Sequence, residues 1–224
     1  NKDVIFTAAT SNLQFTGNIV GTGNITTTGT GNIYFKGNND SATGAVTVGP
    51  GGTLNISGGS ALGDTSALTL GAGSNLAATA SETTGSLAGS GNVTFSNNAV
   101  LTVGGNNQST TYSGVMQGGN ANSSLIKQGT GTLTLTNANT NTGTTTINGG
   151  TLQLGDGVNL GTVGGDIADN ANLTFKNGGD QTYTGVISGT GSLTVNGSGT
   201  LSLTGNNTFT GNTPTSGGNL LAET

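Results

Sequence analysis

The segment Gly129–Gly155 brings the same pair of leucines back after 19 residues, and this return constrains the fold more than any other feature. Leu133 and Leu135 alternate with threonines, which is the pattern of a β-strand that buries one face. Leu152 and Leu154 repeat that pattern in the same order. A unit of about twenty residues that restores its own buried face is expected to form one coil of a solenoid.

Two turns and a short strand connect the leucine pairs. The segment Asn137–Thr142 has the Asn and Thr content of a turn, and Gly143, which follows it, is able to adopt a positive φ. The β-branched residues of Thr144–Ile147 predict a second strand. The Asn-Gly-Gly sequence at 148–150 is a strong turn signal. Each coil is therefore expected to contain several short strands separated by tight corners.

A longer internal repeat joins the two ends of the chain. Residues 15–39 align with residues 183–207 without a gap, and their glycines and alternating apolar residues match. A register kept over this length indicates repetition rather than shared composition. We interpret residues 1–224 as a single β-helical repeat domain. Its copies are expected at approximately residues 13–63, 99–161 and 171–224.

Three stretches depart from the regular pattern. The middle copy is longer near Gly118–Ser124, where a protruding loop is expected. The segment Ala77–Thr84 has the least pattern and is interpreted as a loop. Pro214 cannot donate to a strand ladder, so the last copy is expected to contain a broken or edge strand.

These patterns predict an all-β fold, a right-handed parallel β-helix of roughly ten coils with no significant helix. Gly accounts for 44 of the 224 residues, against a usual share of about 7%, and with the many β-branched threonines it disfavours helix. At about 4.8 Å per coil, the rod is expected to be on the order of 50 Å long. A β-sandwich is the alternative, but it would not require such long self-similarity.

Composition excludes several classes of function. The chain has four Lys and no Arg, so nucleic-acid binding through phosphate neutralisation is not expected. It has no Cys, which removes disulfides and thiolate metal sites, and no apolar run of the roughly 18 residues that a membrane helix needs. No signal peptide precedes the first strand, which predicts a fragment of a longer protein.

No catalytic, cofactor-binding or metal-binding residue is predicted. Glycan-cleaving β-helices need clustered carboxylates, and this chain has no His or Arg to assist them. The nine acids are dispersed: Asp3, Asp40, Asp64, Glu82, Asp156, Asp166, Asp169, Asp180 and Glu223. Three of these, Asp156, Asp166 and Asp169, offer the oxygen ligands of a calcium site, but they are interpreted as solvated turn residues.

Three further patterns have both a structural and a functional interpretation. Tyr34, Tyr112 and Tyr183 are interpreted as packing residues, with a sugar-stacking platform as the alternative. The outward threonines of residues 132–136 resemble one row of an ice-binding face, but neighbouring coils do not repeat the trio. Asn pairs at 38–39, 97–98 and 206–207 are interpreted as turn residues that stack into hydrogen-bonded ladders.

The order of strand, Asn/Thr turn, strand, Asn-Gly-Gly and strand in Gly129–Gly155 resembles the autotransporter-associated β-strand repeat. This repeat belongs to passenger domains of bacterial autotransporters, the type V secretion family. The resemblance is partial at Leu13–Ile56 and Leu173–Leu221, and together the three segments cover more than half of the chain.

The resemblance implies a secreted passenger displayed on the cell surface or outer membrane, with possible extracellular release. It also implies a C-terminal outer-membrane barrel in the full-length protein, which these residues do not contain. The expected function is a non-enzymatic stalk or adhesin of a virulence type. Its expected partner is a host-cell surface protein or glycan. The alternatives are a second copy of the chain, in aggregation or biofilm formation, and a carrier role for an enzymatic domain elsewhere.

Overall fold

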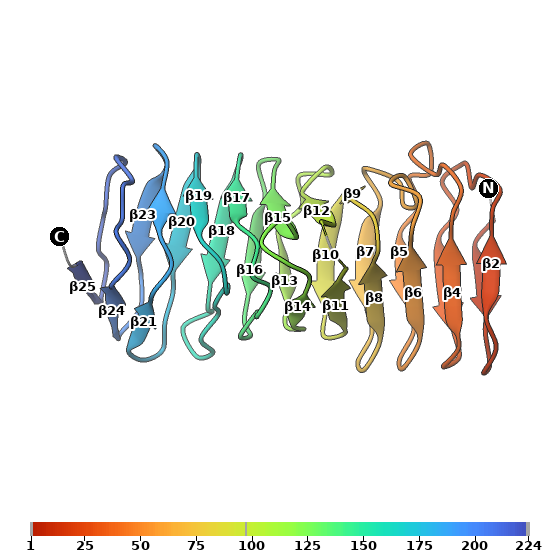
Figure 1. Cartoon of the computed structure of the whole chain (residues 1–224), viewed down its shortest axis with the longest axis horizontal. Helices are drawn as coiled ribbons and strands as arrows, with labels where there is room; N and C mark the ends of the chain where they lie inside the picture. Colours follow the sequence, from red (N-terminus) through yellow and green to blue (C-terminus); the bar gives the residue numbers. More distant parts are fainter. Residues whose placement is uncertain (1, 97, 223–224) are drawn as a thin grey trace.

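The computed structural model describes residues 2–96 and 98–222, which form an all-β rod of stacked coils (Figure 1). Strands pair in parallel with equivalent strands of the neighbouring coils, and one sheet contains ten strands. The prediction of an all-β parallel solenoid of about ten coils is confirmed, and these parallel ladders exclude the β-sandwich. No helix of the described residues has the length and hydropathy to cross a membrane.

Each coil contributes strands to up to three faces. Face 1 is the ten-stranded sheet of β1 (Val4–Thr7), β3 (Ile25–Thr28), β5 (Val46–Val48), β7 (Ala67–Leu70), β10 (Ser86–Gly89), β13 (Thr110–Tyr112), β16 (Thr132–Leu135), β18 (Thr151–Leu154), β20 (Asn172–Phe175) and β23 (Ser192–Val195). Face 2 contains β2 (Leu13–Phe15), β4 (Asn32–Phe35), β6 (Thr53–Ile56), β8 (Asn75–Ala78), β11 (Asn92–Phe95) and β14 (Met116–Gly118), and later β21 (Gln181–Tyr183), β24 (Thr200–Leu203) and β25 (Asn219–Ala222). Face 3 contains β9 (Glu82–Thr84), β12 (Val100–Val103), β15 (Ser124–Lys127), β17 (Thr145–Ile147), β19 (Ile167–Asp169) and β22 (Ile187–Ser188).

Only face 1 has a strand in every coil from β1 to β23; in the last described coil it is reduced to an isolated bridge. Face 2 has no strand in the coils of β16 and β18, where residues 136–144 and 155–166 follow irregular paths to face 3. Face 3 has no strand before β9 in the described residues. The coils therefore share one continuous ladder, while the other two faces tolerate loops.

The core is a set of rows of apolar side chains that stack from coil to coil. Leu133 lies opposite Leu152, which lies opposite Leu173 in the next coil. Their exposed fractions are 1% or less, whereas Thr151 and Gln153, which alternate with the leucines of β18, are partly exposed. The predicted superposition of the two leucine pairs is confirmed. Parallel ladders and like-on-like stacking together hold each coil to its neighbours.

Buried asparagines connect the coils where a strand is missing. Asn39 accepts a hydrogen bond from Ile19 N and donates one to Ala61 O at 2.7 Å. In the interrupted part of face 2, Asn139 Oδ1 accepts from Met116 N at 2.8 Å, and its Nδ2 donates to Thr162 O at 2.8 Å. A primary amide carries a donor and an acceptor, as a peptide unit does, so it replaces part of the lost ladder.

Glycines lie where backbones of successive coils approach most closely. A Cβ atom added to Gly44 would lie 1.9 Å from Gly23 O, inside any allowed contact. Gly143 does not use the positive φ that is available to a glycine. Its Cβ would instead lie 1.9 Å from Ser123 O, so steric approach requires the glycine there. Close stacking thus explains much of the glycine content.

The irregular stretches follow the predictions in part. The interpretation of Ala77–Thr84 as a loop is wrong, because β8 ends inside it and β9 occupies its second half. Small residues and a buried Glu82 obscured the alternation that these strands have. Around Pro214 only an isolated bridge forms, between Thr215 and Val195, as the proline predicts.

Candidate functional surface

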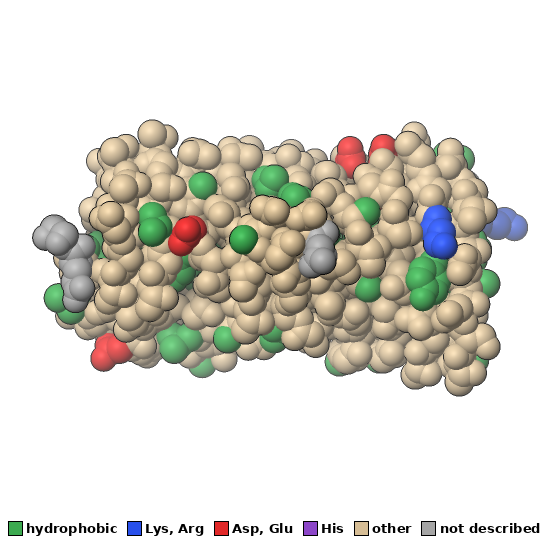
Figure 2. Space-filling view, in the orientation of Figure 1, with side chains coloured by type: hydrophobic (Ala, Val, Ile, Leu, Met, Phe, Trp, Pro, Cys, Tyr) green, Lys and Arg blue, Asp and Glu red, His purple; other side chains and the backbone are tan. Residues whose placement is uncertain are grey.

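The described part of the chain has no pocket, so any site must lie on the side of the rod. Figure 2 shows a surface dominated by uncharged polar side chains and backbone, with few charged groups. Three features of this surface and of the core just beneath it are relevant to function. They are the ionisable side chains, the outward row of face 1, and one exposed apolar loop.

The three carboxylates of the calcium alternative bind separate backbone groups. Asp166 Oδ1 accepts a hydrogen bond from Val186 N at 2.8 Å. Asp169 is buried, and its Oδ1 accepts from Ala171 N at 3.1 Å. Asp156 accepts hydrogen bonds within its own loop. No group of three Asp, Glu, His or Cys among residues 2–96 and 98–222 is placed to hold a metal ion, and Glu223 lies outside these residues.

Glu82 is a buried carboxyl at the first position of β9, with 3% of its surface exposed. Its Oε2 accepts a hydrogen bond from Ala61 N at 2.6 Å, and its Oε1 accepts one from Thr83 N at 3.1 Å. Burial raises the pKa of Glu82 to about 7, although these hydrogen bonds oppose the rise. The carboxyl group joins β9 to the preceding coil, which has no face 3 strand, and this role is structural.

Lys127 is a buried cation at the end of β15, and its exposed fraction is 1%. Its Nζ donates to three carbonyl oxygens at a corner: Gln128 O at 2.6 Å, Gly129 O at 3.2 Å and Gly149 O at 3.0 Å. Burial lowers the pKa of the Lys127 ammonium. The three carbonyls satisfy all its donors, so this lysine joins two coils and is not available to a ligand.

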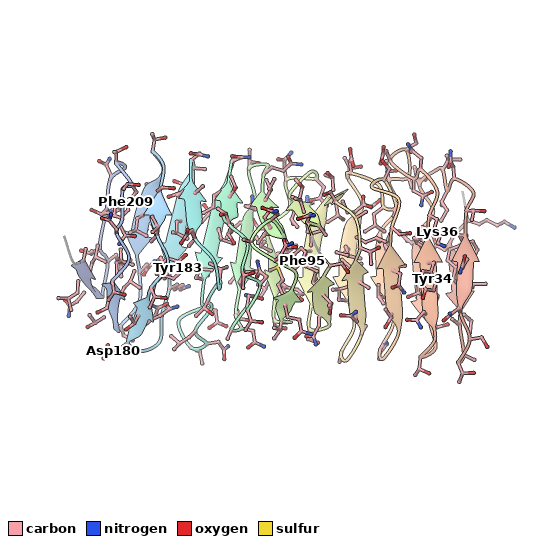
Figure 3. All side chains as sticks on the ribbon, viewed as in Figure 1. Tyr34, Lys36, Phe95, Asp180, Tyr183 and Phe209 are labelled. Atoms are coloured by element: carbon pink, nitrogen blue, oxygen red, sulfur yellow. The ribbon has the colours of Figure 1, made fainter. Side chains whose placement is uncertain are left out.

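The three tyrosines divide into two buried residues and one surface residue. Tyr112 and Tyr183 are buried, and their hydroxyls donate to Gly91 O at 2.9 Å and Gly165 O at 2.5 Å. Burial raises the pKa of both phenols. Tyr34 faces outward from β4, beside Lys36, whose Nζ lies 5.6 Å from the ring centroid (Figure 3). The packing interpretation holds for the two buried tyrosines.

A row of threonines runs along the outer side of face 1. The register of the ladders aligns the central outward position of successive strands. Threonine occupies this position at Thr26, Thr47, Thr69, Thr111, Thr134, Thr174 and Thr194. The trio at 132–136 is not repeated, but its central member belongs to this row. Ala88 and Gln153 interrupt the row, and Thr134 is only 9% exposed, so hydroxyls line parts of this uncharged side of the rod.

Large exposed apolar side chains are concentrated at the ends of the rod and in one loop. Val4, Ile5, Val20 and Leu221 belong to the first and last coils of the described chain. The others are Val158 and Leu160, with exposed fractions of 83% and 41%. They lie in loop 155–161, which follows β18 where face 2 has no strand.

Comparison with known proteins identifies the class of this solenoid. The model of the passenger-associated-transport-repeat family matches residues 125–154 and 193–221. The "Adhesin BmaC autotransporter" of Brucella suis biovar 1 is 52% identical over 50 residues. The chain is an autotransporter passenger with passenger-associated-transport repeats. The aligned part covers 22% of the passenger chain and 2% of the Brucella protein, and no solved structure matches the chain.

The repeats of the passenger coincide with its regular coils. The first match begins inside β15 and ends with β18, so it includes nearly all of Gly129–Gly155, where the sequence predicted the repeat. The second match covers β24 and most of β23 and β25. The partial resemblance at Leu13–Ile56 lies outside both matches. The family implies association of the passenger with the cell surface or outer membrane.

Sequence reasoning missed the buried polar groups of the passenger and its exposed loop. Alternation in Leu125-Ile126-Lys127 was a usable signal, because it places Lys127 on the same inward side as Leu125. Asn39 was interpreted as a turn residue that stacks in a ladder, but its amide bonds backbone groups of two other coils. Asn97 lies outside the described residues. No pattern in the sequence marks Val158 as exposed.

Proposed function

We propose that this passenger is a non-enzymatic, surface-displayed stalk and adhesion module that attaches a bacterium to host cells or other surfaces. The observation that carries the proposal is the similarity to an autotransporter adhesin within a chain whose regular coils form one continuous ladder. The polar side faces of such a rod present many groups along its length, and a stable core holds them in fixed positions.

The chemistry of the described residues supports display rather than reaction. The carboxylates of Asp156, Asp166 and Asp169 accept hydrogen bonds from backbone N–H groups, and the described part of the surface has no pocket in which to enclose a substrate. Enzymatic sites concentrate perturbed ionisable groups in a cleft. Here burial raises the pKa of Glu82, Tyr112 and Tyr183 and lowers that of Lys127, and all four side chains lie inside the coils. Hydrogen bonds lower the pKa of the exposed Asp156, but its carboxylate binds backbone groups of its own loop.

Adhesion of the purified chain tests the proposal. Beads coated with residues 1–224 are added to cultured mammalian epithelial cells and to uncoated plastic, and beads coated with an unrelated β-solenoid of similar length are the control. We expect saturable attachment above the control on at least one surface. Equal attachment of both bead types everywhere would contradict an adhesive role and leave a plain spacer.

Self-association is the second candidate, and the threonine row of face 1 favours it. The uncharged hydroxyls of this row, which Ala88 and Gln153 interrupt, offer hydrogen bonds to the same row of another copy without charge repulsion. Sedimentation velocity at increasing concentration measures it directly. A strict monomer at high concentration, with no clumping of displaying cells, would exclude this candidate. A carrier role for an enzymatic domain elsewhere predicts no activity in these residues alone.

A further inference from the structure

Loop 155–161 is built as a rigid support for exposed aliphatic side chains. Asp156 Oδ1 accepts hydrogen bonds from Val158 N at 2.9 Å and from Asn159 N at 2.7 Å. Its Oδ2 accepts from Asn159 Nδ2 at 2.9 Å. One carboxylate thus fixes the chain on both sides of Val158, so the most exposed large apolar side chain projects from an ordered turn.

The ends of the loop are fixed to coils on both sides. Gly155 N donates to Leu135 O at 2.8 Å, and Gly157 N donates to Lys176 O at 2.8 Å. Gln181 Nε2 donates to Gly161 O at 3.0 Å. Gly155 has a φ of +85°, a conformation that residues with a side chain rarely adopt. These contacts hold the loop in the place that a face 2 strand occupies in other coils.

We infer that loop 155–161 is a contact element of this passenger, in which Val158 and Leu160 enter a shallow apolar pocket of a protein on the host cell. The inference rests on the proposed adhesive function and names the site and the class of partner. Loops that replace a regular strand of a solenoid commonly form its binding face. A turn already ordered in the free protein loses little conformational entropy on binding.

The chemistry of the loop favours a protein over a glycan or a lipid surface. Glycan sites stack sugars on aromatic rings and bind their hydroxyls with amides, whereas the projecting side chains here are aliphatic. Binding to anionic membranes depends on clustered basic residues. This chain has a net charge of −5 and four Lys, so an apolar protein pocket is the best match.

Matched substitutions of two exposed valines test the inference. Val158→Asn removes the apolar contact from the loop, and Val20→Asn makes the same change at a valine that is 71% exposed in the first coil. Both variants are expected to fold, because neither valine packs in the core. Beads coated with each variant are added to cultured epithelial cells. We expect V158N to bind about tenfold more weakly than wild type, and V20N to bind as wild type does.

A second pair of variants tests the positioning role of Asp156. Asp156→Ala removes the acceptors and keeps Val158, so faster hydrogen exchange at Val158 and Asn159 and about threefold weaker binding are expected. Asp156→Asn retains an acceptor oxygen and is expected to restore most of both properties. Faster exchange without any loss of binding would show that order in the loop does not contribute.

The outcomes separate the inference from the proposed function. Absence of wild-type attachment overturns both. Attachment that V158N and V20N retain equally overturns the inference and leaves adhesion intact.

Trypsin treatment of the cells is expected to abolish attachment, whereas periodate oxidation of their glycans is not. Attachment that survives trypsin but is lost after periodate would assign a glycan partner. Binding of the chain to phosphatidylcholine and phosphatidylserine vesicles that V158N abolishes would assign a lipid surface.

Discussion

The pH dependence of the N-terminal coils is expected to depend on Glu82. Burial raises its pKa from 4.5 to about 7, while the unfolded chain is expected to titrate near the lower value. Between these pH values the native state keeps a proton that the unfolded state has lost. The free energy of unfolding therefore falls as pH rises through this window and becomes level above about pH 7. One pKa unit corresponds to about 1.4 kcal/mol, so the full effect is ~3 kcal/mol.

Glu82→Gln isolates this contribution. The amide oxygen of glutamine retains the acceptor for Ala61 N but carries no charge at any pH. The variant should therefore gain about 2–3 kcal/mol relative to wild type between pH 5 and pH 8. Native-state hydrogen exchange at Ala61, Leu62 and Thr83, corrected for the intrinsic effect of pH on exchange, measures this local opening.

Asp180→Asn is the matched control, because Asp180 Oδ1 also accepts a hydrogen bond from a backbone N–H of another coil. The donor is Thr200 N, at 2.7 Å. Asp180 is exposed and lies near the opposite end of the rod from the N-terminus (Figure 3). This variant should leave the pH dependence of the amides near Glu82 unchanged. The reasoning would be refuted if E82Q and wild type differed by the same opening free energy at pH 5 and pH 8.

Three further destabilising substitutions, two of them with a matched control, test the packing of the coils through chemical denaturation. Leu152→Ala should lower the free energy of unfolding by about 3 kcal/mol because it empties part of a closed apolar row, whereas Gln153→Ala on the outer side should change it by less than about 1 kcal/mol. Gly44→Ala should destabilise the native state strongly, since its Cβ would lie 1.9 Å from a backbone oxygen, and Gly17→Ala, with nothing within 4 Å, should be tolerated. Asn139→Ala leaves buried backbone groups unpaired and should cost about 3 kcal/mol; an unchanged midpoint would show that water replaces the amide.

The regular part of this fold could be predicted because it depends on the local periodicity of apolar residues. Leu133, Leu135, Leu152 and Leu154 specify strands with one buried side, and their spacing specifies a coil of constant length. A coil that restores its own pattern buries its apolar side only against identical neighbours, so stacking follows from the sequence alone. The same local signal marks the passenger repeat at Gly129–Gly155.

Tertiary structure decided which faces are interrupted and what fills the gaps. The inward position of Lys127 becomes acceptable only because the carbonyls of Gln128, Gly129 and a corner of the next coil converge on its ammonium. Gly143 is required by an oxygen 20 residues away in sequence rather than by its own φ. The exposure of Val158 likewise depends on the absence of a strand in its coil. Such features depend on how neighbouring coils lie against one another, and no single segment of sequence specifies that. The period of the apolar residues, in contrast, can be recognised within a single segment.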